Sequence, residues 1–319
     1  MFIILAAFAA AIFMGLNIGG NNAAASMGAA YGAKARTKKQ AVILIAIFSL
    51  LGAVFSGGEV IKTLGKGIVP GDTITLTAAI IAIAAAGLAM SFANLIRVPI
   101  STSQAAVGAV TGIGIFYGVL DTHLLSKIIG WWVVTPLLAF ALAYVAGNYL
   151  HPILLYWLVD HESEEKIRKI INLLLIVSGC YVAYSAGANN AANAVGPLVG
   201  AGFMTQTNGA IVGGLAIGAG AILLGGRILN TVGNEITELC AIRAVFVEFI
   251  SATIVHVASI LGIPVSLGEI VTAAIIGVGC ASQGIAAAKS DTVKKIVLMW
   301  FVSPLFAGVI AYVALRVLI

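Results

Sequence analysis

The sequence predicts an all-α polytopic membrane protein. Its composition, its internal repeats and its distribution of basic residues lead to that prediction. The chain has 319 residues, 61% of them hydrophobic, and its mean hydropathy is +1.10. Charged residues make up 9%, against about 25% in a typical soluble domain. A soluble fold of this size cannot cover its surface with so few polar groups, so a water-soluble enzyme is excluded.

Internal repeats divide the chain into two related halves. Gly19–Ala33 returns as Gly187–Ala201, with 8 of 15 positions identical at an offset of 168. Three further blocks recur in the same order: Gly52–Ile68 with Gly220–Ile236, Val98–Ser101 with Ile263–Ser266, and Trp132–Val145 with Trp300–Val313. We therefore expect transmembrane repeat 1 at 1–150, a charged cytoplasmic connector at 151–169, and transmembrane repeat 2 at 170–319.

Each half contains about five hydrophobic stretches, which predicts about 10–12 helical segments in all. The stretches are 2–33, 40–57, 73–95, 103–119 and 128–150, then 170–202, 208–226, 236–261, 267–283 and 294–319. The first stretch of each half is long enough for two half-helices that meet at a break. The fourth stretch, 103–119 or 267–283, is short and Gly-rich, so a full span and a re-entrant hairpin both stay open.

Basic residues predict the orientation. With the N-terminus outside, the cytoplasmic side receives Lys34, Arg36, Lys38, Lys39, Arg97, Lys166, Arg168, Lys169, Arg227, Lys289, Lys294 and Lys295. Only Lys62, Lys66, Lys127 and Arg316 fall outside. The positive-inside rule then places both termini outside a cell membrane that the chain crosses several times. An odd number of crossings per half makes the second repeat inverted. The sequence has no basic stripe of the kind that binds nucleic acid, so we expect no nucleic acid partner.

Two glycine–asparagine blocks predict breaks in the first helix of each half. They read G-G-N-N from Gly19 and G-A-N-N from Gly187. Inverted repeats with interrupted helices are typical of secondary transporters, which bind substrate near the bilayer midplane. Glycine permits unwinding. Freed carbonyls and asparagine oxygens suit a cation such as Na⁺, and the amides of a half-helix suit an anion. The alternative is that these small residues only let helices pack closely.

A second repeated motif predicts helix starts. It reads P-I-S-T-S-Q at Pro99–Gln104 and P-V-S-L-G-E at Pro264–Glu269. Proline followed by Ser or Thr is a helix-start signal in which a hydroxyl caps the first amides. In a membrane the same hydroxyls and amides also suit an oxyanion, so a simple cap and a ligand site are both open.

Intramembrane carboxylates are costly and usually functional. Glu248 lies in the middle of a span, where it could pair with Arg243 or His256 or bind a coupling cation. Glu269 could be a ligand or a gate. No His or Cys cluster has metal-ligand spacing, and no Walker or G-x-S-x-G motif occurs, so we expect no enzyme. Trp131, Trp132 and Trp300 are typical of membrane-interface anchors.

The motifs together resemble the inorganic phosphate transporter (PiT) family of Na⁺- or H⁺-coupled phosphate permeases. The resemblance rests on G-A-N-N-A-A-N-A-V-G-P, G-G-R-x-x-x-T-x-G, V-E-F-I-S-A and G-I-P-V-S, and it covers nearly the whole chain. By position it implies ion and phosphate contacts at Asn21, Asn22, Asn189, Asn190, Asn193, Ser101, Thr102, Ser103, Ser266 and Glu248. With the residue chemistry above, we expect phosphate contacts at Asn22, Ser101, Thr102, Ser103, Gln104, Asn190 and Ser266, and sodium contacts at Asn21, Asn22, Asn189, Asn190, Asn193, Glu248 and Glu269. The resemblance also implies a homodimer, and we expect no cofactor other than Na⁺ as coupling ion.

The chain departs from the family pattern at several site positions. The family often has Asp at the fourth motif position, where both copies here have Asn, and it often has His where Gln104 and Glu269 stand. Leu267-Gly268 replaces the hydroxyl pair, so we expect the hydroxyl cradle mainly in the first half. Asparagine ligates Na⁺ but takes up no proton near neutral pH. These departures therefore favour Na⁺ coupling, while Glu248 and Glu269 keep H⁺ open.

The predicted function is a sodium-coupled inorganic phosphate symporter that works by alternating access in the lipid bilayer. Proton-coupled permeation of phosphate or sulfate is the close alternative. An ion channel lined by the asparagine helices is an alternative of a different class.

Overall fold

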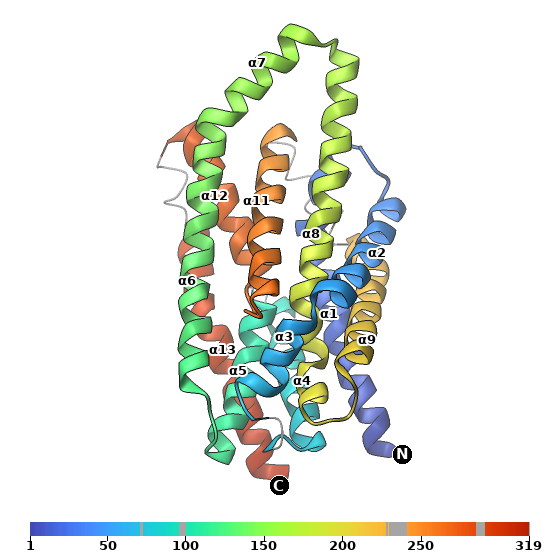
Figure 1. Ribbon diagram of the computed structural model, residues 1–319, viewed down its shortest axis with the longest axis vertical. Coiled ribbons are helices and arrows are strands. Elements are labelled where there is room, and N and C mark those ends of the chain that lie inside the picture. The colour runs from blue at the N-terminus through green and yellow to red at the C-terminus, as the bar shows by residue number, and fades with distance from the viewer. Residues whose placement is uncertain (71–72, 96–99, 228, 230–240, 285–290, 319) are drawn as a thin grey trace.

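The computed structural model describes residues 1–70, 73–95, 100–227, 229, 241–284 and 291–318, and this part of the chain contains helices and no strand (Figure 1). The α-helices of the first half are α1 (Phe2–Gly32), α2 (Lys38–Ser56), α3 (Gly58–Lys62), α4 (Leu76–Leu95), α5 (Thr102–Tyr117) and α6 (Thr122–Val145). After them come α7 (His151–His161), α8 (Glu164–Gly200), α9 (Gln206–Gly220), α11 (Ala241–Ile260), α12 (Leu267–Gln283) and α13 (Asp291–Leu318). Three π-helical turns, η1 (Thr63–Gly67), η3 (Ala146–Leu150) and η4 (Ala221–Gly225), extend α3, α6 and α9. The all-α prediction is confirmed.

Eight helical segments in the described part are long and apolar enough to cross a bilayer. They include α1, α2, α8 and the continuous run from α6 through α7. The two helices of the fourth stretches, α5 and α12, have 16 and 17 residues and fall short of that length. The chain is therefore a polytopic membrane protein in which the helices of the fourth stretches, α5 and α12, are too short to span by themselves.

The short helices form hairpins that enter the bundle from opposite ends. In Figure 1, α11 descends from the upper end to mid-height and α12 returns upward, whereas α4 and α5 occupy the lower half. The long helix α1 rises through the bundle where α8 descends, and both termini lie at the lower end. These directions are the ones an inverted repeat requires, and the inverted relation itself stays a prediction. The lengths of α5 and α12 favour the re-entrant arrangement of the two left open for the fourth stretches, and that arrangement stays a prediction.

The predicted breaks in the first helix of each half are wrong. Helix α1 runs unbroken through Gly19–Asn22, and α8 runs unbroken through Gly187–Asn190. The glycines instead allow close approach between helices: a Cβ on Gly19 would overlap the Ile217 carbonyl of α9, and one on Gly187 would overlap the Ser49 carbonyl of α2. Small residues that bring helix backbones together are common in membranes, where helices associate through close packing.

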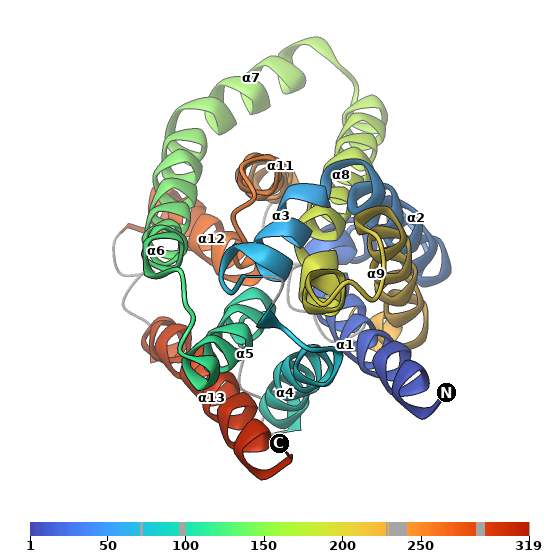
Figure 2. The same ribbon diagram turned by 60° about the horizontal axis from the view of Figure 1, so that its bottom comes forward.

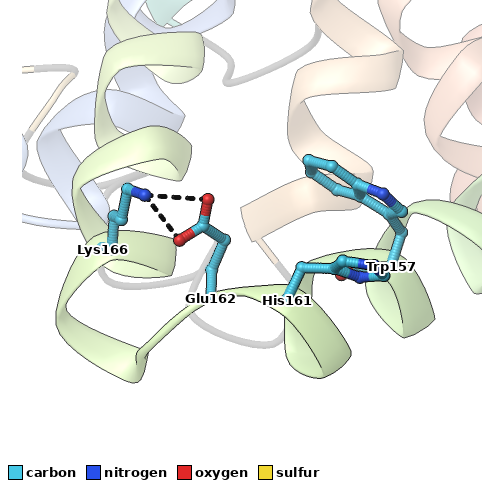
Figure 3. Close-up of polar contacts among 4 residues, drawn as sticks. All are labelled: Trp157, His161, Glu162 and Lys166. Atoms are coloured by element: carbon cyan, nitrogen blue, oxygen red, sulfur yellow. Dashed lines mark hydrogen bonds and ion pairs between the residues drawn. The ribbon is translucent and has the colours of Figure 1, made fainter.

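The predicted connector at 151–169 is helical apart from a short turn. Helix α7 continues α6, the chain turns at Glu162 and Ser163, and α8 begins (Figures 1 and 2). Lys166 Nζ donates to Glu162 Oε1 at 2.9 Å, and the His161 ring stacks on Trp157 with ring centroids 5.3 Å apart. Figure 3 shows these four residues. These contacts are largely exposed, so each contributes less than about 1 kcal/mol. The cytoplasmic location of this corner stays a prediction.

Candidate functional site

A cavity of about 140 Å³ lies where α1, α5 and α12 meet. A cavity needs a volume of about 10–15 Å³ to hold one water molecule. This cavity therefore has room for a small hydrated or partly dehydrated ion. Its lining is Asn21, Asn22, Ala25, Ile100, Ser101, Thr102, Ser266, Leu267, Gly268, Glu269 and Thr272. The first six of these residues belong to the first half of the chain, and the other five belong to the second half. The cavity therefore lies between the halves.

Both P-x-S motifs begin helices at this cavity, as predicted. Ser101 caps α5 by accepting from the amide of Gln104 at 3.2 Å, and Ser266 caps α12 by accepting from the amide of Glu269 at 3.4 Å. The N-terminus of a helix carries about half a positive charge and has free amides. Two such ends face one cavity, and this arrangement suits an anion.

Buried side-chain oxygens gather beside the cavity, between α5 and α8. Ser103 Oγ donates to Asn190 Oδ1 at 3.2 Å. The Asn193 amide donates to Ser103 Oγ at 3.2 Å and to Asn190 Oδ1 at 3.3 Å, and lies 3.5 Å from Thr102 Oγ1. Asn193 Oδ1 and Asn190 Nδ2 are buried without a hydrogen-bond partner. These four residues, which we call the oxygen cluster, join the first half to the second.

The asparagines of α1 lie on the other side of the cavity. Asn22 is 7% exposed, and its Nδ2 is buried without a partner. Asn21 is exposed and lines the same cavity. The unbroken helix therefore presents side-chain amides, in place of the unwound backbone that the sequence predicted.

Asn189 makes a different set of contacts from its neighbours. Its amide donates to Ser259 Oγ and to the Ile263 carbonyl, each at 3.0 Å, and its Oδ1 accepts from the Val265 amide at 3.0 Å. These bonds engage all of its polar atoms with α11 and the turn before α12. Its predicted role as a sodium ligand stays a prediction, while its contacts hold the tip of the hairpin.

Glu248 is buried away from the cavity and pairs with neither of the residues proposed for it. Its Oε2 accepts a hydrogen bond from Ser178 Oγ of α8. The described part of the chain has no ion pair between Glu248 and Arg243 or His256, and His256 instead contacts Tyr181 and Ser56. Glu248 lines a separate small cavity of about 50 Å³. Among the described residues, Ala25 alone lines both this cavity and the cavity of about 140 Å³.

Sequence reasoning missed two residues that support the site. Ser303 of α13 donates to Gln104 Oε1 at 3.2 Å. Trp132, predicted as an interface anchor, is buried, and its indole N–H donates to the Pro264 carbonyl at 2.9 Å. That bond fixes the start of α12. Trp132 and Pro264 both lie in repeated blocks, and that recurrence marked each position as important. Nothing in the sequence indicated that the two residues contact each other.

Comparison with known proteins agrees with this architecture. The model of the Phosphate transporter family matches residues 18–311. Sulfate permease CysP of Bacillus subtilis is 41% identical over 97% of this chain and 86% of its own length. A Pyrococcus furiosus protein with the provisional name phosphate permease PF1020 is 30% identical over 94% of this chain and 92% of its own. The solved structure titled "The sodium-dependent phosphate transporter" superposes with a TM-score of 0.86, at 25% identity, covering 100% of this chain and 99% of that one.

The chain is a polytopic helical membrane protein with a polar cavity between its two halves, and the proteins that it resembles are transporters and permeases. The chain belongs to the phosphate transporter family. The predicted family and the predicted absence of enzymatic activity are confirmed.

Proposed function

We propose that the protein is a sodium-coupled symporter that carries inorganic phosphate across the cell membrane by alternating access. The observation that carries the proposal is the cavity itself, at which two helix N-termini and the unpaired amide of Asn22 converge. Phosphate oxygens accept hydrogen bonds from amides and hydroxyls. The family and the sodium-dependent neighbour of the same fold support phosphate and Na⁺.

None of the described residues that line the cavity is basic, and Glu269 is the single ionisable residue among them. A cation from solution would therefore supply the counter-charge for the anion. The membrane potential opposes entry of an anion by about 2.3 kcal/mol per charge for each 100 mV. Na⁺ bound next to phosphate cancels part of that charge and so makes both binding and inward movement favourable.

We place a coupling Na⁺ at the oxygen cluster of Thr102, Ser103, Asn190 and Asn193. Hard cations prefer oxygen ligands, and the cluster is buried and holds an unpaired carbonyl oxygen on Asn193. The cluster and the cavity share Thr102, so a cation in one lies close to an anion in the other. Because the cluster joins the two halves, movement of one half against the other would open the site to each side in turn. The orientation with both termini outside and the homodimer stay predictions.

Sulfate is the second candidate substrate. The relative that is 41% identical bears the name sulfate permease. Asn also replaces Asp in both copies of the family motif, which removes two acceptors from the site region. Proton coupling is the corresponding alternative for the driving ion.

Uptake of radiolabelled phosphate into proteoliposomes, with and without an inward Na⁺ gradient, tests the proposal, with sulfate and arsenate as competitors. We expect Na⁺-dependent, saturable uptake that Asn22→Ala and Asn190→Ala each abolish with little loss of folded protein. Near wild-type uptake in both variants would refute the site. Counterflow separates carrier from channel, because only a carrier shows trans-stimulated exchange.

A further inference from the structure

We infer that the Glu269 carboxylate selects the anion by accepting a hydrogen bond from a protonated oxygen, so that the cavity takes phosphate and rejects sulfate. The inference rests on the proposed function and names the residue that decides its substrate. Phosphate keeps at least one P–OH hydrogen near neutral pH, whereas sulfate keeps none. The two anions otherwise share shape and size.

The Glu269 side chain is buried at the cavity and partly unused. The residue is 5% exposed, lines the cavity, and its Oε1 has no hydrogen-bond partner. A buried polar atom without a partner is costly, and more so when it is charged. A ligand that donates to this oxygen would remove that cost.

A purely structural role as a helix cap does not explain this side chain. Ser266–Glu269 has the S-x-x-E pattern of a capping box, in which the glutamate would accept from the amide of the capping residue. Thr37 and Gln40 at the start of α2 make both reciprocal bonds of such a box. At α12 only the bond from the Glu269 amide to Ser266 Oγ is present in the described part of the chain. The carboxyl group is therefore available to the cavity.

The rest of the lining is rich in donors. The Asn22 amide is unpaired, Ser101 and Thr102 carry hydroxyls, and the first amides of α5 and α12 face the same space. Phosphate satisfies both kinds of group, because its oxygens accept from the donors while its P–OH donates to Glu269. Sulfate would place one of its oxygens against the carboxylate, and two acceptors would face each other with no proton between them.

The size of the discrimination follows from that mismatch. A hydrogen bond to a charged group contributes about 1.5–3 kcal/mol, and 1.4 kcal/mol is tenfold in affinity. Replacing Glu269 by Gln, whose amide can donate to sulfate, should lower the preference for phosphate over sulfate by about 10- to 100-fold. Sites that bind a substrate hydroxyl reject the analogue that lacks it by as much as roughly 10⁴-fold.

The test measures the KM for phosphate and the inhibition constant for sulfate in Na⁺-driven phosphate uptake by proteoliposomes. We compare the wild type with Glu269→Gln, Glu269→Asp and the exposed control Glu59→Gln. We expect sulfate to compete weakly in the wild type and in the control. In Glu269→Gln the KM for phosphate should rise and sulfate should compete strongly. Glu269→Asp keeps a carboxylate acceptor but holds it one methylene further from the bound anion. This variant should therefore raise the KM for phosphate and still exclude sulfate.

An unchanged ratio of phosphate to sulfate in Glu269→Gln would overturn the inference while leaving the proposed function intact. A higher KM for Na⁺ with that ratio unchanged would also overturn it, since Glu269 would then be a sodium ligand. If Glu269→Gln does not fold, the Glu269→Asp variant decides, because competition by sulfate there would contradict an acceptor role. Absence of Na⁺-driven phosphate uptake in the wild type would refute the proposed function and the inference together.

Discussion

Asn193→Ala separates the sodium site from the fold. In the first half the matching position is Ala25, and α1 is still an unbroken helix there. Alanine is therefore compatible with this place in the repeat. The substitution removes the proposed ligand oxygen, Asn193 Oδ1, and the contacts of the Asn193 amide with Thr102, Ser103 and Asn190. A polar contact to a charged group contributes about 1.5–3 kcal/mol, so loss of the ligand oxygen should raise the KM for Na⁺ about 10- to 100-fold.

The assay is phosphate uptake as a function of external Na⁺ concentration, with the Asn193→Ala protein reconstituted at the same density as the wild type. The lost amide hydrogen bonds should lower the free energy of unfolding by about 2 kcal/mol, and the variant should still fold because Asn190 Oδ1 keeps the bond from Ser103. The exposed Asn208 supplies a matched control, and Asn208→Ala should behave as wild type. An unchanged KM for Na⁺ in Asn193→Ala would refute the location of the coupling ion.

Three further predictions concern stability. Asn189→Ala removes three bonds at the tip of the second hairpin and should cost about 3 kcal/mol, seen as a lower melting temperature in detergent; an unchanged melting temperature would contradict its positioning role. Gly187→Ala should prevent folding because its Cβ would overlap the Ser49 carbonyl, whereas Gly130→Ala meets nothing within 4 Å and should yield normal protein; equal yields of monodisperse protein would rule out the packing argument. Lys166→Ala breaks only an exposed ion pair, so stability should change by less than about 1 kcal/mol and phosphate uptake should stay at the wild-type rate.

The helix starts at the site could be predicted because their signals are local. Ser101 and Ser266 cap α5 and α12 in the way the motif indicates, each by accepting a hydrogen bond from an amide three residues further on. The repeat then placed both starts in comparable positions of the two halves. Composition was equally direct, since a chain with 9% charged residues can fold only in a bilayer.

The role of the glycine–asparagine blocks could not be predicted because it depends on neighbours distant in sequence. In a sequence, a glycine that lets a helix unwind looks the same as a glycine that lets another backbone approach. The close approach of the Ile217 carbonyl to Gly19 shows that this glycine has the second role. Asn189 and Asn190 are adjacent and identical in type, yet one turns to the hairpin tip and the other to Ser103. Successive residues of a helix point about 100° apart, so adjacency in the sequence did not imply a shared site.

Simultaneous measurement of radiolabelled sodium and phosphate fluxes in the same proteoliposomes tests the coupling most directly. We predict that phosphate accelerates Na⁺ entry in a fixed ratio, and that an inward Na⁺ gradient accumulates phosphate above its external concentration until an ionophore dissipates the gradient. Sodium entry that is independent of phosphate, or phosphate that only equilibrates, would contradict a sodium-coupled symporter.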